Sequence, residues 1–179
     1  MVDTDELVAE CVAAIAEPEP RLAMREVLRR AVREPGNFGG HVGFRVLHRA
    51  PDLTVLDVVW PPLASIIPHD HRMWAVIGIY AGQEDSTFFR REGTTIVESG
   101  RREAVEHDVS LLGDDVVHAV HNPTRAPTGG IHVYGGDLIG IPRSQWNAAT
   151  LQEEPYDFDA RQREFERANA RFAAGSDGG

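Results

Sequence analysis

The chain has 179 residues, 42% of them hydrophobic, and its 18 basic and 28 acidic side chains give a formal net charge of −10. This length and composition are those of one globular domain with a substantial core. The negative charge argues against nucleic acid and anionic membrane surfaces as partners, because both repel an acidic protein. It leaves small-molecule substrates open, since a local arginine can form a cationic pocket in an acidic protein.

Cysteine content and hydropathy indicate the cellular compartment in which the protein is expected. Cys11 is the only cysteine, so no disulfide can form within the chain. The acidic start lacks the basic region of a signal peptide, and no apolar run reaches the roughly 20 residues that span a bilayer. We therefore expect a cytoplasmic protein, either a monomer or a homodimer.

The N-terminal part of the chain, residues 4–33, has helical periodicity. Thr4 is a candidate cap for a first helix, and the prolines at positions 18 and 20 interrupt the pattern. A second apolar stripe follows and stops near Pro35 and Gly36. Both stripes predict helices that pack on the rest of the domain.

From about residue 41 to 141 the pattern changes to short runs of β-branched and aromatic residues separated by turn residues. Many short strands at even spacing are typical of an all-β sandwich or barrel. Residues 155–175 return to helical character, and 173–179 resemble a frayed tail. We expect one domain in three segments: a helical segment over 1–40, a β-barrel over 41–145, and a helical segment with a flexible tail over 146–179. The predicted strands are Val42–His48, Leu53–Trp60, Trp74–Tyr80, Ser86–Arg91, Thr94–Glu98, Val116–His121 and Gly130–Tyr134.

The chemistry of the chain is indicated by His69-Asp70-His71, with a second histidine group about fifty residues later. In an extended strand, His69 and His71 point to the same face, whereas Asp70 points away. His118 on a neighbouring strand could complete three neutral nitrogen ligands, and His121 is its rival. Three protein ligands with open positions are typical of a catalytic metal site.

These residues resemble the two motifs of the cupin superfamily. His69, His71 and Gly82 match the first motif, and His118 with Asn122 matches the second. The usual glutamate of the first motif is absent, because its place falls on Ala75 or Val76. The resemblance implies a mainly β fold, a cupin-type double-stranded β-helix barrel with N-terminal and C-terminal helices.

Among cupins, a three-histidine site without the glutamate looks most like the cysteine dioxygenase (thiol dioxygenase) family. Arg45 lies on an early strand at a similar distance before the HxH motif, and His132-Val133-Tyr134 stands where that family has a His-x-Tyr segment. Other positions depart from the family. Gly130 replaces a serine, Gly135-Gly136 replaces a Ser-Pro pair, and the cysteine that crosslinks to tyrosine in animal enzymes is absent.

The resemblance implies a mononuclear Fe(II) dioxygenase that converts a small, anionic thiol to a sulfinate with O2. Fe(II) would bind to His69, His71 and His118, with Zn, Ni or Mn as alternative metals. Tyr134 and His132 would act in catalysis, and Arg45 and Trp74 would bind the substrate, with Trp60 as a further pocket wall. Glu84 and Asp85 follow a turn and are expected to be solvated. Two alternatives stay open: a three-histidine cupin of other chemistry (C–C cleaving dioxygenase, isomerase or hydrolase), or a non-catalytic small-molecule-binding cupin.

Overall fold

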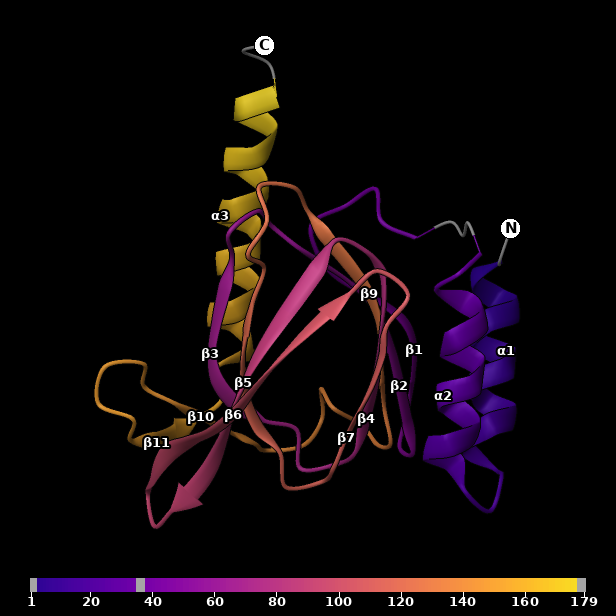
Figure 1. The fold of residues 1–179 in the computed structure, drawn as a ribbon, viewed down its shortest axis with the longest axis horizontal. Coiled ribbons are helices and arrows are strands. Elements are labelled where there is room, and N and C mark those ends of the chain that lie inside the picture. Colours follow the sequence, from indigo (N-terminus) through magenta and orange to yellow (C-terminus); the bar gives the residue numbers. More distant parts are fainter. Residues whose placement is uncertain (1–2, 35–37, 177–179) are drawn as a thin grey trace.

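Two antiparallel sheets enclose one interior in the computed structural model, which describes residues 3–34 and 38–176 (Figure 1). One sheet has the strand order β1-β2-β9-β4-β7 and the other β11-β10-β3-β8-β5-β6. The predicted mainly β fold, a double-stranded β-helix barrel with helices at both ends of the chain, is confirmed by this strand order. The strands are β1 (Gly43–Ala50), β2 (Leu53–Trp60), β3 (Ser65–Asp70), β4 (Ala75–Ala81), β5 (Gln83–Glu92), β6 (Thr95–Val105), β7 (Val109–Leu112), β8 (Val117–His121), β9 (Thr128–Tyr134), β10 (Ser144–Trp146) and β11 (Glu153–Pro155).

Two N-terminal helices, α1 (Thr4–Ile15) and α2 (Pro20–Ala31), pack against the outer face of the five-stranded sheet (Figure 1). The cap of α1 is Asp3 and not Thr4, because the Asp3 carboxylate accepts a hydrogen bond from the Asp5 N–H. Pro20 begins α2, where its missing N–H leaves no hydrogen bond unmade. The end predicted for this helix, near Pro35 and Gly36, lies outside the described residues.

The C-terminal helix α3 (Phe158–Ser176) runs along the opposite side of the molecule from α1 and α2 (Figure 1). Its Phe165 is buried in the barrel core and lies against Phe44 and Trp60, with ring centroids 4.5 and 5.5 Å away. The helix therefore helps to close the barrel. Of the predicted tail over 173–179, the first four residues are helical and the last three, 177–179, lie outside the described residues. No helix in the described part of the chain is long and apolar enough to cross a membrane.

The strand β2 explains how the two faces of the five-stranded sheet differ. All eight of its residues are buried. Alternate side chains of a strand face opposite sides, so Leu56, Val58 and Trp60 join the barrel core, whereas Val55 packs with the two N-terminal helices. The same alternation decides which residues of β1, β4 and β9 can reach the interior.

Candidate metal centre

Strands β3 and β8 bring the two histidine groups together. His69 lies directly opposite His118 in the antiparallel register of these strands. His71 follows the end of β3 and turns its side chain to the same side as His69, as the i, i+2 spacing predicts. All three histidines are buried, so the fold places them inside the barrel.

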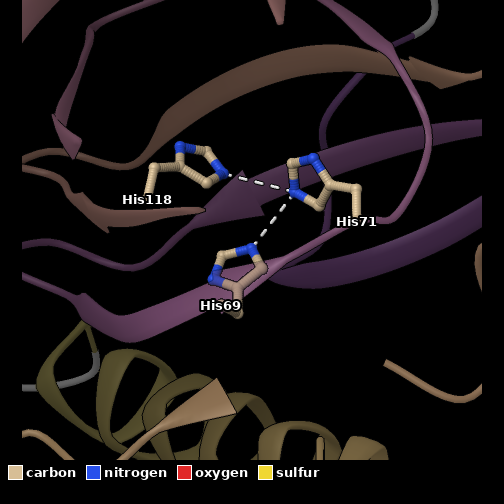
Figure 2. A group of neighbouring side chains, drawn as sticks. All are labelled: His69, His71 and His118. Carbon is tan, nitrogen blue, oxygen red and sulfur yellow. Dashed lines mark hydrogen bonds between the residues drawn. The ribbon is translucent and has the colours of Figure 1, made fainter. Parts of the chain in front are cut away.

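The three imidazole rings converge on a common point (Figure 2). The Nε2 atom of His71 lies 3.3 Å from Nε2 of His69 and 3.2 Å from Nε2 of His118. Two nitrogen ligands at about 2.0–2.1 Å from one metal ion must themselves lie about 3.0–3.4 Å apart. The spacing of His71 from both partners therefore fits shared ligation of a metal ion, and the ligand nitrogens of all three histidines lie within 4.8 Å of one another.

The Nδ1 atoms of His69 and His118 face oxygen atoms, which leaves their Nε2 atoms available for a metal. Nδ1 of His69 faces the Ile67 carbonyl oxygen at 3.1 Å, and Nδ1 of His118 faces the Ser86 hydroxyl at 3.2 Å. When each Nδ1–H donates to its oxygen, Nε2 carries the lone pair that a metal requires. Nδ1 of His71 is buried and has no hydrogen-bond partner within the described residues.

Burial keeps the three imidazoles neutral. It lowers the pKa of His69 and of His71 well below the ordinary value, and the neighbouring His118 adds to the effect in each case. Burial also lowers the pKa of His118, to about 4. Neutral imidazole is the form that binds metal ions, so the site is prepared for a cation at neutral pH.

Asp70, between the two histidines of β3, holds this strand in place. It points away from the side of His69 and His71, as alternation predicts, and it is fully buried. Its carboxylate accepts hydrogen bonds from the guanidinium groups of Arg72 and Arg91 and from the Ser144 N–H. The charge that lies behind the metal ligands is thus neutralised by two arginines.

His121, the last residue of β8, and Asn122, which follows it, lie outside the metal centre. The Asn122 amide donates to the carbonyl oxygens of Pro61 and Ala126, both at 2.9 Å, and so joins two loops. The rival ligand His121 contacts Ser65 and Ala64 instead. The structure therefore separates His121 from His69 and His71, because it lies three residues after His118 on the strand and faces the other way.

A small cavity of about 40 Å³ adjoins the three histidines. This is far below the roughly 300–1,000 Å³ of pockets for drug-sized ligands. Its apolar walls come from both sheets and from α3. Its polar lining residues, besides the three histidines, are His132, Tyr134, Arg143, Tyr156 and Arg161.

The structure places Arg45, the predicted substrate-binding residue, outside this cavity. Its neighbours Phe44 and Val46 line the cavity, so alternation turns Arg45 to the outer face of β1. There its guanidinium donates a 2.7 Å hydrogen bond to the fully buried carboxylate of Asp57, its cross-strand neighbour. Arg45 thus neutralises a buried acid.

Trp74 also lies outside the cavity. It comes just before β4 and shares the outer face with Val76, where both pack with the cluster under the N-terminal helices. Ala75 and Ile77 face the barrel interior instead. Trp60, expected as a further wall, does line the cavity.

His132 and Tyr134 line the cavity, as the sequence predicts. His132 Nδ1 lies 3.3 Å from the Tyr134 hydroxyl oxygen, and the Tyr134 ring lies 5.0 Å from the ring of the candidate ligand His71. Burial raises the pKa of Tyr134, so its hydroxyl remains protonated at neutral pH. Tyr134 can therefore offer a neutral hydroxyl beside the metal centre.

Three charged residues of the site were missed by sequence reasoning. Glu84, expected to be solvated, is 3% exposed and lies inside the barrel. Alternate residues of β5 face the same side, so Glu84 faces inward with Ser86 and Phe88, both of which contact His118. This alternation was the sequence signal that could have placed Glu84 inside the barrel. Arg143 and Arg161 line the cavity from segments that no motif connects to the histidines.

Comparisons with known proteins concern the fold alone. No family model matches the chain. Similar solved structures include a protein from Bacillus halodurans, with 14% identity, a TM-score of 0.49, and coverage of 61% of this chain and 77% of that one. An RmlC-like cupin family protein with a double-stranded beta-helix fold from Methanocaldococcus jannaschii has 12% identity, a TM-score of 0.47, and coverage of 59% and 89%. Oxalate decarboxylase from Bacillus subtilis has 14% identity, a TM-score of 0.46, and coverage of 56% and 27%.

Proposed function

We propose that the chain is a mononuclear non-haem Fe(II) dioxygenase that oxidises a small, anionic thiol to its sulfinate. The observation that carries the proposal is the convergence of three neutral histidine nitrogens, from His69, His71 and His118, beside a small cavity. With no carboxylate in this ligand set, a bound divalent cation keeps its full charge of +2 and attracts an anionic sulfur ligand. We infer a small substrate from the small volume of the cavity, and a negatively charged one from the arginines in its wall.

Fe(II) held by these histidines would supply the capacity to bind a thiolate and to activate O2. The reaction balances as thiol plus O2 giving sulfinate plus one proton. Both oxygen atoms are transferred to sulfur, which loses four electrons to O2. No further reductant is required, which suits a cavity with no place for a large organic cofactor.

Arg143 is the residue we assign to the anionic group of the substrate. It lines the cavity and is buried, and its guanidinium lies 3.4 Å above the centre of the Tyr156 ring. One nitrogen donates to the Asp70 carbonyl oxygen at 3.2 Å. Among the described residues, no carboxylate forms an ion pair with Arg143. A substrate carboxylate can therefore pair with this planar, always-charged group.

Arg161 on α3 adds a second cation to the same wall. Its Nη1 pairs with Glu164 at 2.7 Å, whereas its Nε is buried without a hydrogen-bond partner within the described residues. Burial lowers the pKa of His69 most, and the neighbouring His118 adds to this effect. The positive charges of Arg143 and, to a smaller extent, Arg161 lower the pKa of His69 further. The electrostatic field in the cavity thus favours an anion.

Tyr134 and His132 are assigned to orientation of the substrate. The Tyr134 hydroxyl stays protonated and lies on the wall beside His71, where it can form a hydrogen bond to the substrate. His132 holds this hydroxyl through Nδ1. The apolar walls, including Trp60 and Leu138, exclude water from the cavity and strengthen these interactions.

The test is O2 uptake by the Fe(II)-loaded chain with cysteine, 3-mercaptopropionate, cysteamine and an aromatic thiol. We expect O2 uptake with a carboxylated thiol, with one sulfinate formed per O2 consumed. In Tyr134→Phe, the rates of O2 uptake and of sulfinate formation should both fall by about tenfold or more. Stoichiometric metal with no uptake on any thiol would reject the proposal. A three-histidine cupin of other chemistry, or one that only binds a small molecule, would then take its place.

A further inference from the structure

A buried carboxylate lies beside the metal centre and has no part in the function proposed above. Glu84, at the start of β5, is 3% exposed. Its Oε2 accepts a 2.6 Å hydrogen bond from the indole Nε1–H of Trp60. Burying a charge is costly unless it is paired, so a second partner for this carboxylate is expected.

That partner is His132. Its Nε2 lies 3.4 Å from Glu84 Oε2, within ion-pair range, and both side chains are 3% exposed. The contact is not aligned as a hydrogen bond, and Nε2 has no other hydrogen-bond partner within the described residues. The opposite ring nitrogen, Nδ1, lies 3.3 Å from the Tyr134 hydroxyl. Trp60, Glu84, His132 and Tyr134 thus form one buried chain that ends at the cavity.

We propose that Glu84 is a positioning residue whose carboxylate favours the His132 tautomer with its proton on Nε2, so that Nδ1 accepts a hydrogen bond from the Tyr134 hydroxyl. A carboxylate can only accept hydrogen bonds, so it favours an N–H facing it. The other tautomer would place the Nε2 lone pair against a negative charge inside the barrel. The effect of Glu84 on turnover rests on the proposed function, but the tautomer does not.

The ionised form of Glu84 is supported by its surroundings. Burial raises the pKa of this carboxyl, but the His132 ring and the Trp60 N–H that face it oppose burial and leave the pKa below the ordinary value. The indole N–H can only donate, so it too requires an acceptor at this position. Both neighbours therefore select the carboxylate form.

The glycine at position 130 leaves the space beside His132 Nε2 open to the side chain of Glu84. A Cβ atom at Gly130 would lie 3.2 Å from His132 Nε2, so a side chain there would press on the ring nitrogen. Because the residue is glycine, nothing from β9 itself reaches Nε2 on that side. The group that faces Nε2 comes instead from β5, which is distant from β9 in sequence.

The test reads the tautomer directly, by long-range ¹H–¹⁵N NMR of the histidine rings in the full-length chain, metal-free and with Zn(II) bound. His132→Gln assigns the signal. The matched pair is Trp60→Phe and Trp60→Phe/Glu84→Met, which both lack the indole N–H and differ only in the carboxylate. We expect His132 to carry its proton on Nε2 in the wild type and in Trp60→Phe, and to shift to Nδ1–H in the double variant.

An unchanged Nε2–H pattern in the double variant would overturn the proposal. If that variant fails to fold, the same spectrum of Glu84→Gln decides, because a neutral amide is a weaker acceptor than a carboxylate. A detectable Nδ1–H population supports the proposal there, and its absence rejects it. Gln83→Met, on the adjacent outward-facing position of β5, is the control and should leave the His132 signals unchanged.

Turnover gives the second readout. If the proposed function also holds, Glu84→Gln should lower kcat about tenfold and leave KM for the thiol within about twofold, because Glu84 acts through His132 and Tyr134 and does not touch the substrate. Equal changes in kcat and KM would contradict a positioning role. Since the NMR result needs neither iron nor turnover, failure of the dioxygenase proposal and failure of this one can be told apart.

Discussion

The carboxylate of Asp70 accepts a 2.7 Å hydrogen bond from the Ser144 backbone N–H, which joins the strand that carries the metal ligands to the C-terminal segment that follows the barrel. The same segment carries Arg143, whose guanidinium donates to the Asp70 carbonyl oxygen. The metal ligands and the cavity cation are therefore fixed to each other through one residue.

Asp70→Ala should lower the free energy of unfolding by about 1–3 kcal/mol, because it leaves the Ser144 N–H buried without an acceptor and removes the partner of two arginines. Urea denaturation measures this difference. It should also weaken Zn(II) binding by about tenfold, because Asp70 orients the strand that holds His69 and His71. Glu92→Ala, which removes an exposed pair with Arg90, is the control and should change stability by less than about 1 kcal/mol. Equal stability losses in the two variants would contradict the role given to Asp70.

His71→Ala should abolish stoichiometric metal binding, because two imidazoles cannot replace a set of three. His121→Ala is the matched control, because it also removes a histidine, from the neighbouring strand β8. The His121 side chain contacts Ser65 and Ala64 instead of the metal centre, so this variant should retain the metal. Elemental analysis of both purified variants gives the comparison. Full metal content in His71→Ala, or its loss in His121→Ala, would show that the ligand set is wrongly assigned.

Arg143→Met should raise KM for a carboxylated thiol about 10- to 100-fold and leave KM for cysteamine nearly unchanged, because only the former offers a carboxylate to the guanidinium. Steady-state O2 uptake with both thiols measures the effect. Arg45→Ala should change neither KM, because Arg45 pairs with Asp57 on the outer face. An equal rise in KM for both thiols in Arg143→Met would reject its role as an anion-binding residue.

Cys11 gives a pH prediction for the core. Burial, with a smaller effect of Glu10, raises the pKa of its thiol from 9.0 to about 12. Above pH 9 the unfolded chain loses this proton while the folded chain keeps it, so stability falls as the pH rises from 9 towards 12. The loss relative to Cys11→Ala should reach about 1.4 kcal/mol at pH 10.

Urea denaturation of wild type and Cys11→Ala at pH 8 and pH 10 isolates this effect from that of other groups that titrate at high pH, such as the buried Tyr134. The native thiol should also resist alkylation at pH 8 and react fully in urea. A stability difference between the two proteins that does not depend on pH would contradict the burial of the thiol.

Local sequence determined much of the metal centre. The i, i+2 spacing of His69 and His71 directs both rings to one side of an extended strand wherever that strand lies. The alternation of β-branched residues likewise predicts strands with one inner and one outer face, and the apolar stripes predict two helices on the outside. These features depend on neighbours in sequence, so a pattern is enough to find them.

The tertiary structure decided the charges around that centre. Arg45 is outside the cavity because the strand β1 presents Phe44 and Val46 to it, and the sequence pattern does not tell which face of a half-buried strand is the inner one. Glu84 faces inward only because β5 joins β8 within the barrel, and Arg143 reaches the cavity through the segment that Asp70 holds. Whether a charged residue is solvated, paired in the interior or free to bind a substrate depends on contacts between distant segments, and such contacts exist only once the two sheets have closed.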